Sequence, residues 1–238
     1  MGNLVHNLEF NLEAALLGEC VSTRNLLSYG IKVLREGAFI DTTPDPIFTM
    51  LSIGLEKLHK LALGAIELDR SNAWPDKATM KGYGHGILTM HETLLGQLAD
   101  RATGKSAYVK GLLSAVSDDP VVAELLSALD IYGRAGRFYY LDIPASAPQD
   151  WIGPNDAWTA IENAAQKDDV VAALQVRAFD NVEDDVAFDA LLAAINQRIS
   201  TSVETVWDAI VACGKNYMMG RAGEVIGFEA DGAMTGRQ

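Results

Sequence analysis

An apolar repeat near the C-terminal end constrains this chain more than any other feature of its sequence. Apolar side chains recur every three or four positions over about eight helical turns, at Phe188, Leu192, Ile195, Ile199, Val203, Val206, Ile210, Cys213 and Tyr217. At about 1.5 Å per residue, such a helix measures about 45 Å, which exceeds the width of a compact domain. We therefore expect this helix either to span the whole domain or to project into a partner subunit.

The rest of the chain also has helical spacing. Apolar stripes predict a helix over residues 4–36, which Gly37 would end, and a second helix over residues 46–69. A third helix is predicted from about residue 87. The segment Asp118-Asp119-Pro120 predicts another helix start, because a carboxylate can cap free amides and proline suits the first helical position. We expect that helix to continue to Asp142, since Pro144 prevents further extension. Because strand-like alternation is missing, the sequence predicts an all-α fold.

The clearest break in the chain is the proline-rich segment 146–155, within a stretch that has three prolines between residues 144 and 154. A chain of 238 residues can bury a sizeable core, and we expect one helical domain over residues 1–227. Its C-terminal helical part would cover residues 156–227. We expect the tail, residues 228–238, to be disordered.

The net charge of −13 is spread unevenly. Residues 141–211 contain 3 basic and 13 acidic side chains, whereas the charges balance over residues 55–140. General nucleic-acid binding is disfavoured, because phosphate neutralisation needs a basic surface, but a local basic pocket in the balanced part stays open. No apolar run approaches the roughly 18 residues of a membrane span, and the first residues lack a signal-peptide pattern, so we expect a soluble, cytoplasmic protein without membrane contact.

The two cysteines, Cys20 and Cys213, are far apart in sequence and form neither a disulfide framework nor a zinc-binding pattern. We interpret both as small buried apolar residues. Motifs for a nucleophile elbow, a phosphate loop or an HExxH zinc site are also missing from the sequence. We therefore expect no cofactor.

The stretch GLEKLHKLAL raises the question of a metal site, because Glu56 and His59 have the spacing found in di-iron bundle proteins. Such a site needs two ExxH motifs and two further glutamates, and this pair is the only one in the chain. We therefore expect no metal, and the alternative is an ion pair between Glu56 and Lys60 at i,i+4. His91 lies on an apolar face, where a hydrogen-bonded core histidine is the favoured interpretation.

Two further segments place polar side chains at helix ends. KGYGHGI contains Tyr83 and His85 among glycines, so that the imidazole could face a cleft. GRAGRFYYLD contains two arginines one turn apart, which could bind phosphates bidentately, beside two tyrosines and an aspartate, namely Arg134, Arg137, Tyr139, Tyr140 and Asp142. The alternative is local, because Asp130 lies four residues before Arg134 and the tyrosines could fill the core.

GLEKLHKLAL, KGYGHGI and GRAGRFYYLD, in this order over residues 50–142, resemble the signature segments of HEPN-like proteins, a helical superfamily of prokaryotic toxins and defence proteins. The resemblance implies an up-and-down bundle of long antiparallel helices, frequently a homodimer. It also implies metal-independent RNA cleavage in the active branches, which use an arginine followed four to six residues later by a histidine. No arginine of this chain has a histidine in that window, and the nearest equivalent is Arg134 with Tyr139 or Tyr140.

Two function classes follow from these segments. In the first, a ribonuclease or defence protein with an RNA or nucleotide ligand, His85 supplies the missing imidazole and the catalytic set is His85, Arg134, Arg137 and Tyr140. In the second, a non-catalytic protein that binds a protein partner, these side chains belong to a structural polar network with Glu56, Lys60, Tyr83 and Asp142. A contact from Glu56 to Arg134 or Arg137 would join the first two segments to the third.

Overall fold

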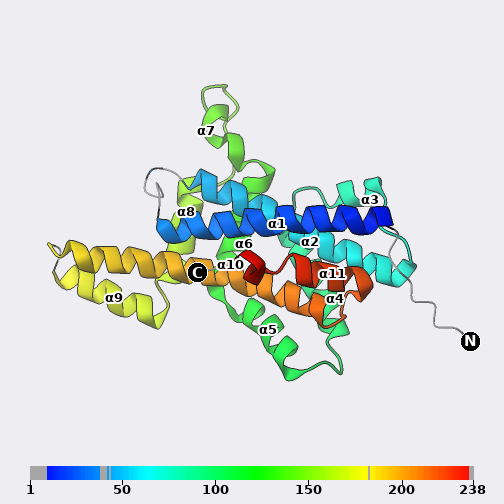
Figure 1. The fold of residues 1–238 in the computed structure, drawn as a ribbon. Coiled ribbons are helices and arrows are strands. Elements are labelled where there is room, and N and C mark those ends of the chain that lie inside the picture. The colour runs from blue at the N-terminus through cyan, green and yellow to red at the C-terminus, as the bar shows by residue number, and fades with distance from the viewer. Residues whose placement is uncertain (1–9, 38–41, 43, 182, 236–238) are drawn as a thin grey trace, which may run out of the picture.

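A computed structural model describes residues 10–37, 42, 44–181 and 183–235. None of these residues forms a strand, which confirms the predicted all-α class (Figure 1). The α-helices, with two short 3₁₀ turns η1 (Gly136–Phe138) and η2 (Gly232–Thr235), follow one another as α1 (Phe10–Glu36), α2 (Asp45–Ser71), α3 (Lys77–Gly82), α4 (Ile87–Arg101), α5 (Ala107–Asp118), α6 (Pro120–Arg134), α7 (Tyr139–Asp142), α8 (Pro154–Ala165), α9 (Asp169–Asp180), α10 (Asp185–Lys215) and α11 (Gly220–Glu229).

Helices α1 and α2 lie side by side and run in opposite directions. A Cβ atom on Gly30 would come within 2.6 Å of the Leu51 side chain, and one on Gly54 within 2.7 Å of the Leu27 side chain. Glycine at these two positions lets the helices approach closely, and the pairing order makes them antiparallel. The expected helix over residues 46–69 is α2, and the first expected helix is α1, although residues 4–9 lie outside the described part of the chain.

Helix α4 runs in the same general direction as α2. His85, just before α4, contacts Glu56; His91 contacts His59; and Arg101, at the end of α4, contacts Asp69. The short helix α3 carries the chain back along α2, so this step departs from a simple up-and-down order. The parallel arrangement brings the start of α4 beside the middle of α2.

The long helix α10 has two different halves. Its C-terminal half lies in the body of the molecule, where Val206 and Trp207 are fully buried and Trp207 Nε1 donates a hydrogen bond to the Ala230 carbonyl at 2.7 Å. Its N-terminal half pairs with α9 in a hairpin that extends beyond the end of α1 (Figure 1). Helix α10 therefore both spans the body and extends beyond it.

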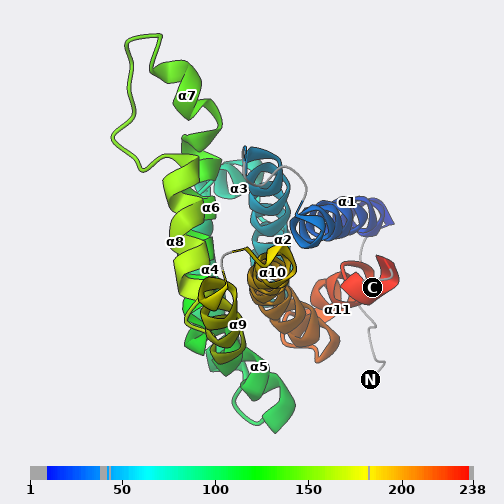
Figure 2. The ribbon, with the colours of Figure 1, turned by 90° about the vertical axis from the view of Figure 1, so that its left-hand side faces the viewer.

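Helix α6 begins where the sequence predicts, with Asp119 accepting a hydrogen bond from the Val121 amide at 2.9 Å. It ends at Arg134, eight residues before the predicted Asp142, because Ala135 leaves the helical region with φ −143°. Two glycines flank this point, and each lowers helix stability by about 1 kcal/mol. The chain continues through η1 into α7, which projects from the bundle in both views (Figures 1 and 2).

The sequence predicts disorder after Phe228, but residues 229–235 are ordered. Ala230 is fully buried, and Lys215 Nζ forms an ion pair with Asp231 Oδ2 at 2.5 Å. A buried carbonyl acceptor and an ion pair hold this segment against α10, and only residues 236–238 of the tail lie outside the described part.

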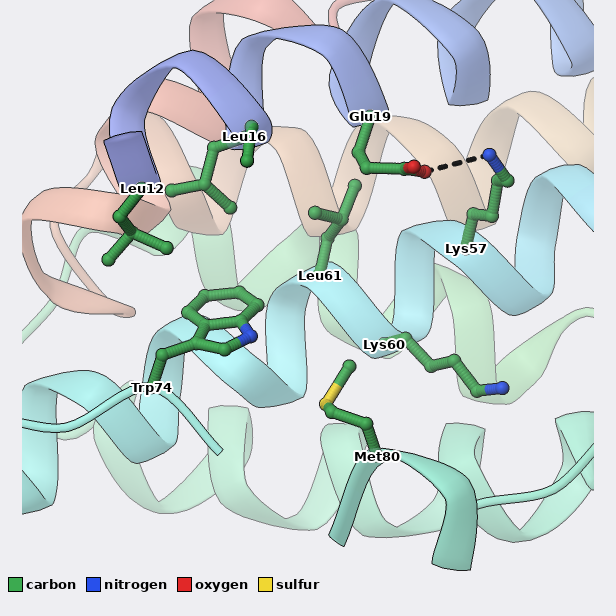
Figure 3. Close-up of a pocket in the computed structure, with 9 residues that line it drawn as sticks. Leu12, Leu16, Glu19, Lys57, Lys60, Leu61, Trp74 and Met80 are labelled. Atoms are coloured by element: carbon green, nitrogen blue, oxygen red, sulfur yellow. Dashed lines mark hydrogen bonds and ion pairs between the residues drawn. The ribbon is translucent and has the colours of Figure 1, made fainter. Parts of the chain in front are cut away.

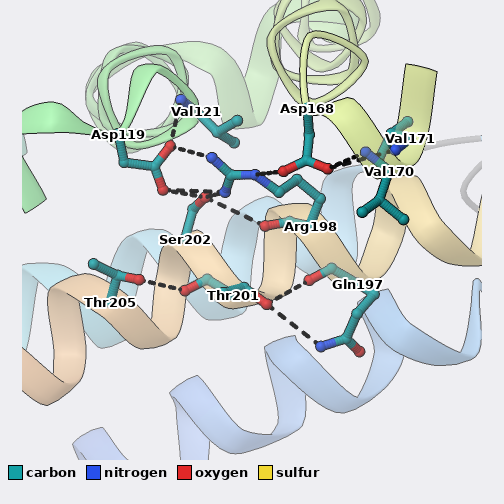
Figure 4. A network of polar contacts seen from close by, with 10 residues as sticks. All are labelled: Asp119, Val121, Asp168, Val170, Val171, Gln197, Arg198, Thr201, Ser202 and Thr205. Carbon is teal, nitrogen blue, oxygen red and sulfur yellow. Dashed lines mark hydrogen bonds and ion pairs between the residues drawn. The ribbon is translucent and has the colours of Figure 1, made fainter. Parts of the chain in front are cut away.

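Polar contacts also join the helices. Lys57 on α2 forms an ion pair with Glu19 on α1 at 2.7 Å (Figure 3). Arg198 on α10 contacts Asp119 at 2.6 Å and Asp168 at 3.4 Å (Figure 4). Because these two aspartates cap α6 and α9, one arginine connects the starts of two helices to α10.

Both cysteines are buried, as the sequence predicts, and burial raises the pKa of each thiol to about 12. Within the described residues, no helix is both long and apolar enough to cross a membrane.

Candidate active site

Glu56, Lys60 and His85 form one hydrogen-bonded cluster between α2 and the start of α4. Lys60 Nζ donates to Glu56 Oε1 at 2.8 Å, as the i,i+4 spacing predicts. His85 Nδ1 lies 3.0 Å from Glu56 Oε2. An ionised carboxylate only accepts hydrogen bonds, so Nδ1 is the protonated nitrogen of the ring. The Nε2 atom of neutral His85 therefore keeps its lone pair.

Exposure differs strongly within this cluster. The Glu56 side chain is 14% exposed, whereas the His85 side chain is 58% exposed. A largely buried carboxylate thus holds one nitrogen of an imidazole that faces solvent. In such a contact the carboxylate fixes the orientation and the tautomer of the imidazole ring.

The glycine-rich segment before α4 builds the loop that carries His85. Gly84 has a left-handed backbone with φ +55°, which glycine adopts without the steric penalty of a side chain. The Gly84 carbonyl accepts a hydrogen bond from Lys60 Nζ at 2.7 Å. Lys60 therefore holds both Glu56 and the loop next to it, and His85 follows Gly84 directly.

Burial alone would raise the pKa of Glu56, but the opposing contacts outweigh it. Hydrogen bonds from Lys60 and His85, together with their positive charge, hold the pKa of Glu56 below its usual value. Glu56 is therefore ionised at neutral pH, and it can stabilise the imidazolium that forms when His85 takes up a proton.

Arg134, at the end of α6, lies on the other side of the same loop. A Cβ atom on Gly86 would come within 2.9 Å of Arg134 Nη2, and one on Gly133 within 3.6 Å of the His85 carbonyl oxygen. The loop before α4 therefore lies against the end of α6. The Arg134 guanidinium group thus lies next to Gly86, the residue that follows His85.

Asp130 holds Arg134 in place, as the local alternative in the sequence predicts. Its carboxylate contacts Arg134 Nε at 3.0 Å and Nη2 at 3.2 Å, and it accepts the Leu88 amide at 3.0 Å. The Arg134 side chain is still 45% exposed. Both contacts to Asp130 use the Nε–Nη2 edge of the guanidinium group. Its Nη1 atom forms no hydrogen bond with the described residues.

The remaining candidates lie apart from this cluster, on η1 and α7. Arg137 is exposed. Tyr140 is 50% exposed and stacks edge-on against Tyr139, with ring centroids 5.2 Å apart. Asp142 accepts a hydrogen bond from Gln149. Because α6 ends before Arg137, these three residues do not continue that helix.

The sequence also places Tyr83 in the polar network and suggests a contact from Glu56 to Arg134 or Arg137. Tyr83 is partly buried and packs against the core beside the cluster. Glu56 contacts Lys60 and His85, whereas Arg134 contacts Asp130. The first two segments of the resemblance therefore meet in direct contact, and the third reaches them through the Arg134–Gly86 approach.

The comparisons with known proteins bring no relative. No family model, no curated protein and no solved structure matches this chain. A proposal for its function therefore has to rest on the arrangement of its own side chains and on its sequence segments.

His59 and His91 form a buried pair that the sequence did not predict as a pair. His59 Nδ1 lies 2.6 Å from the Leu55 carbonyl, and His59 Nε2 lies 2.9 Å from His91 Nδ1. His91 is thus the hydrogen-bonded core histidine that its apolar face predicts. Burial lowers the pKa of His59 to about 4, and burial with the adjacent His59 lowers that of His91 to about 3.

This pairing also answers the question that Glu56-x-x-His59 raises. The Glu56 side chain contacts His85 at the surface, while the His59 ring contacts His91 in the core. Within the described part of the chain, no three His, Cys, Asp or Glu side chains are grouped so that they could hold a metal ion. The two side chains of the motif therefore serve different clusters.

Proposed function

We propose that this chain is a HEPN-like protein that cleaves RNA without a metal ion, with His85 as the general base. The observation that carries the proposal is the contact of 3.0 Å between Glu56 Oε2 and Nδ1 of the solvent-facing His85. The resemblance of three sequence segments to HEPN-like proteins supports the substrate class. His85 takes the place of the histidine that is missing after Arg134.

In the proposed reaction, neutral His85 accepts at Nε2 the proton of a ribose 2′-hydroxyl. The 2′-oxygen then forms a bond to the adjacent phosphorus, and the bond from phosphorus to the 5′-oxygen breaks. The leaving 5′-oxygen takes a proton from water, and His85 returns its proton to solvent. The products are a 2′,3′-cyclic phosphate and a 5′-hydroxyl, and Glu56 stabilises the transient imidazolium.

Arg134 is suited to hold the phosphate during this reaction. Arginine binds phosphate oxygens strongly, and the exposed guanidinium lies against the loop that carries His85. Asp130 fixes its orientation in advance. The Arg134 guanidinium group would be shared between Asp130 and the phosphate, so we expect weak binding of the phosphate before the reaction. Its stabilising effect should increase as negative charge develops on the phosphorane.

Cleavage of a fluorescent single-stranded RNA in excess EDTA tests the proposal. We expect His85→Ala to lower the rate by about 10²–10⁴-fold, because it removes the base. Glu56→Gln should lower the rate less, since the imidazole stays and only its support is lost. The matched controls are Glu67→Gln and Arg70→Ala, which change an exposed ion pair on the same helix and should leave the rate unchanged. Equal cleavage by wild type and His85→Ala would refute the assignment.

A second function class is favoured by a different observation. The segment from η1 to the start of α8 exposes large apolar side chains, each about half to two-thirds exposed, at Phe138, Tyr140, Leu141, Ile143, Trp151 and Ile152. We define this segment, residues 136–153, as the α7 arm. Exposed apolar side chains gathered in a projecting segment are typical of protein interaction sites. We propose that the arm binds protein, and that its partner is a second copy of the chain.

Light scattering at micromolar concentration tests the homodimer. We expect a mass of twice the 25.6 kDa of one chain. Leu141→Glu and Trp151→Glu should shift the mass toward the monomer, because each places a charge in an apolar contact. Tyr108→Glu, at an equally exposed position on α5, should have no effect. A monomeric mass for the wild type would refute the dimer.

A further inference from the structure

A small pocket lies between the start of α1, the middle of α2 and the segment around α3. Its cavity volume is ≈ 250 Å³. Its walls are mainly apolar, and the larger apolar side chains that line it are Leu12, Leu16, Leu61, Trp74 and Met80 (Figure 3). This volume is slightly below the roughly 300–1,000 Å³ of typical small-molecule sites, so the pocket suits a small ligand with an apolar body.

Local structure fixes two walls of the pocket. A Cβ atom on Gly64 would lie 2.5 Å from the six-membered ring of Trp74, so glycine is needed for the indole to lie against α2. Met80 is on α3, whose start is capped by Asp76 accepting the Thr79 amide at 2.8 Å. The indole and the thioether therefore face the pocket from segments that are held in position, which reduces the ordering that a ligand must bring about.

Charged side chains also line the pocket, namely Lys57, Lys60 and Glu19. Lys60 forms an ion pair with Glu56 at 2.8 Å, so Lys57 is the lysine of the lining that a ligand could contact. Lys57 contacts Glu19 at 2.7 Å, but the Glu19 side chain is 55% exposed, so an anion from a ligand can compete for the ammonium group. An apolar pocket with one accessible ammonium group at its rim suits a ligand that carries one negative group.

We propose that this pocket binds a small amphiphile with an apolar body and a single carboxylate, such as a medium-chain fatty acid. The apolar body would contact Trp74, Met80 and Leu61, and the carboxylate would lie at the rim beside Lys57. The site is independent of the proposed RNA cleavage, although Lys60 contributes to both the pocket and the Glu56–His85 contact.

Isothermal titration calorimetry with decanoate tests the proposal, with decanol as the uncharged comparison. We expect one site per chain and about fivefold tighter binding of decanoate than of decanol, because the head-group ion pair is exposed. Ala15→Trp fills the pocket and should weaken decanoate binding at least about tenfold. Ala14→Trp is the matched control, because Ala14 is exposed on the same helix and does not line the pocket.

Lys57→Gln tests the head group separately. This variant should lower decanoate affinity to that of decanol and leave decanol affinity unchanged. Thermal melting followed by circular dichroism shows whether each variant is folded. The proposal is overturned if neither ligand binds folded wild-type protein, if Ala15→Trp binds decanoate as tightly as Ala14→Trp does, or if Lys57→Gln weakens both ligands equally.

Discussion

At the scale of single residues, sequence spacing predicts contacts within one helix and misses contacts between helices. It predicts the Glu56–Lys60 pair, the Asp130–Arg134 pair and a hydrogen-bonded His91. The partners Glu56 and His85 are 29 residues apart, and their contact depends on how α4 is placed against α2. Nothing in a local pattern contains that placement, so the candidate site became visible only in three dimensions.

The buried histidine pair predicts a pH dependence of stability. The pKa of both histidines is lower in the fold than the usual 6.5, so the folded state keeps them neutral while the unfolded chain binds protons. The stabilisation is complete above pH 6.5 and is lost as the pH falls toward 4. As the pH falls through that window, protonation of each histidine in the unfolded chain should lower the free energy of unfolding by about 1.4 kcal/mol per pH unit.

Urea unfolding between pH 6.5 and 5 measures this slope. His91→Gln should remove about half of it, because one of the two buried imidazoles is gone and glutamine does not titrate. His85→Ala changes a histidine of the exposed cluster and serves as the comparison. A slope that His91→Gln leaves unchanged would show that the pair does not cause the pH dependence.

At the scale of helices, the sequence predicts their existence well and their ends less well. The start of α6 follows from Asp119 and Pro120, whose effects are local. Its end at Arg134 does not, because apolar spacing continues through Tyr140 while the backbone turns at Ala135. Periodicity shows which residues could share a helix face, whereas the glycines at positions 133 and 136 weaken the helix where it stops.

The crossing of α10 and α11 gives a prediction at this scale. A Cβ atom on Gly214 would come within 2.9 Å of Gly227 Cα and closer still to the Gly223 carbonyl, and backbone cannot move aside as a flexible side chain can. Gly214→Ala should therefore lower the free energy of unfolding by about 2 kcal/mol or more.

Gly111→Ala is the matched control for that variant. Gly111 lies inside α5, and a Cβ atom there would meet nothing within 4 Å. Alanine should raise stability by about 1 kcal/mol at this position, because it favours helix more than glycine does. Chemical unfolding of both variants should give opposite signs, and equal effects would contradict the close crossing.

At the scale of the whole molecule, helical spacing predicts the all-α class but not the arrangement of the helices. The parallel step from α2 to α4 depends on contacts between segments that are distant in sequence. Part of the acidic charge of residues 141–211 lies on the hairpin of α9 and α10, which extends beyond the end of α1 (Figure 1).

The chemical nature of the product ends is the sharpest test of RNA cleavage by His85. Purified protein is incubated in EDTA with an oligonucleotide that contains a single ribonucleotide, and the products are resolved by mass spectrometry. We expect a 2′,3′-cyclic phosphate and a 5′-hydroxyl, with no product when that ribose carries a 2′-O-methyl group or in the His85→Ala variant. Cleavage of the methylated oligonucleotide, or ends with a 3′-hydroxyl and a 5′-phosphate, would contradict it.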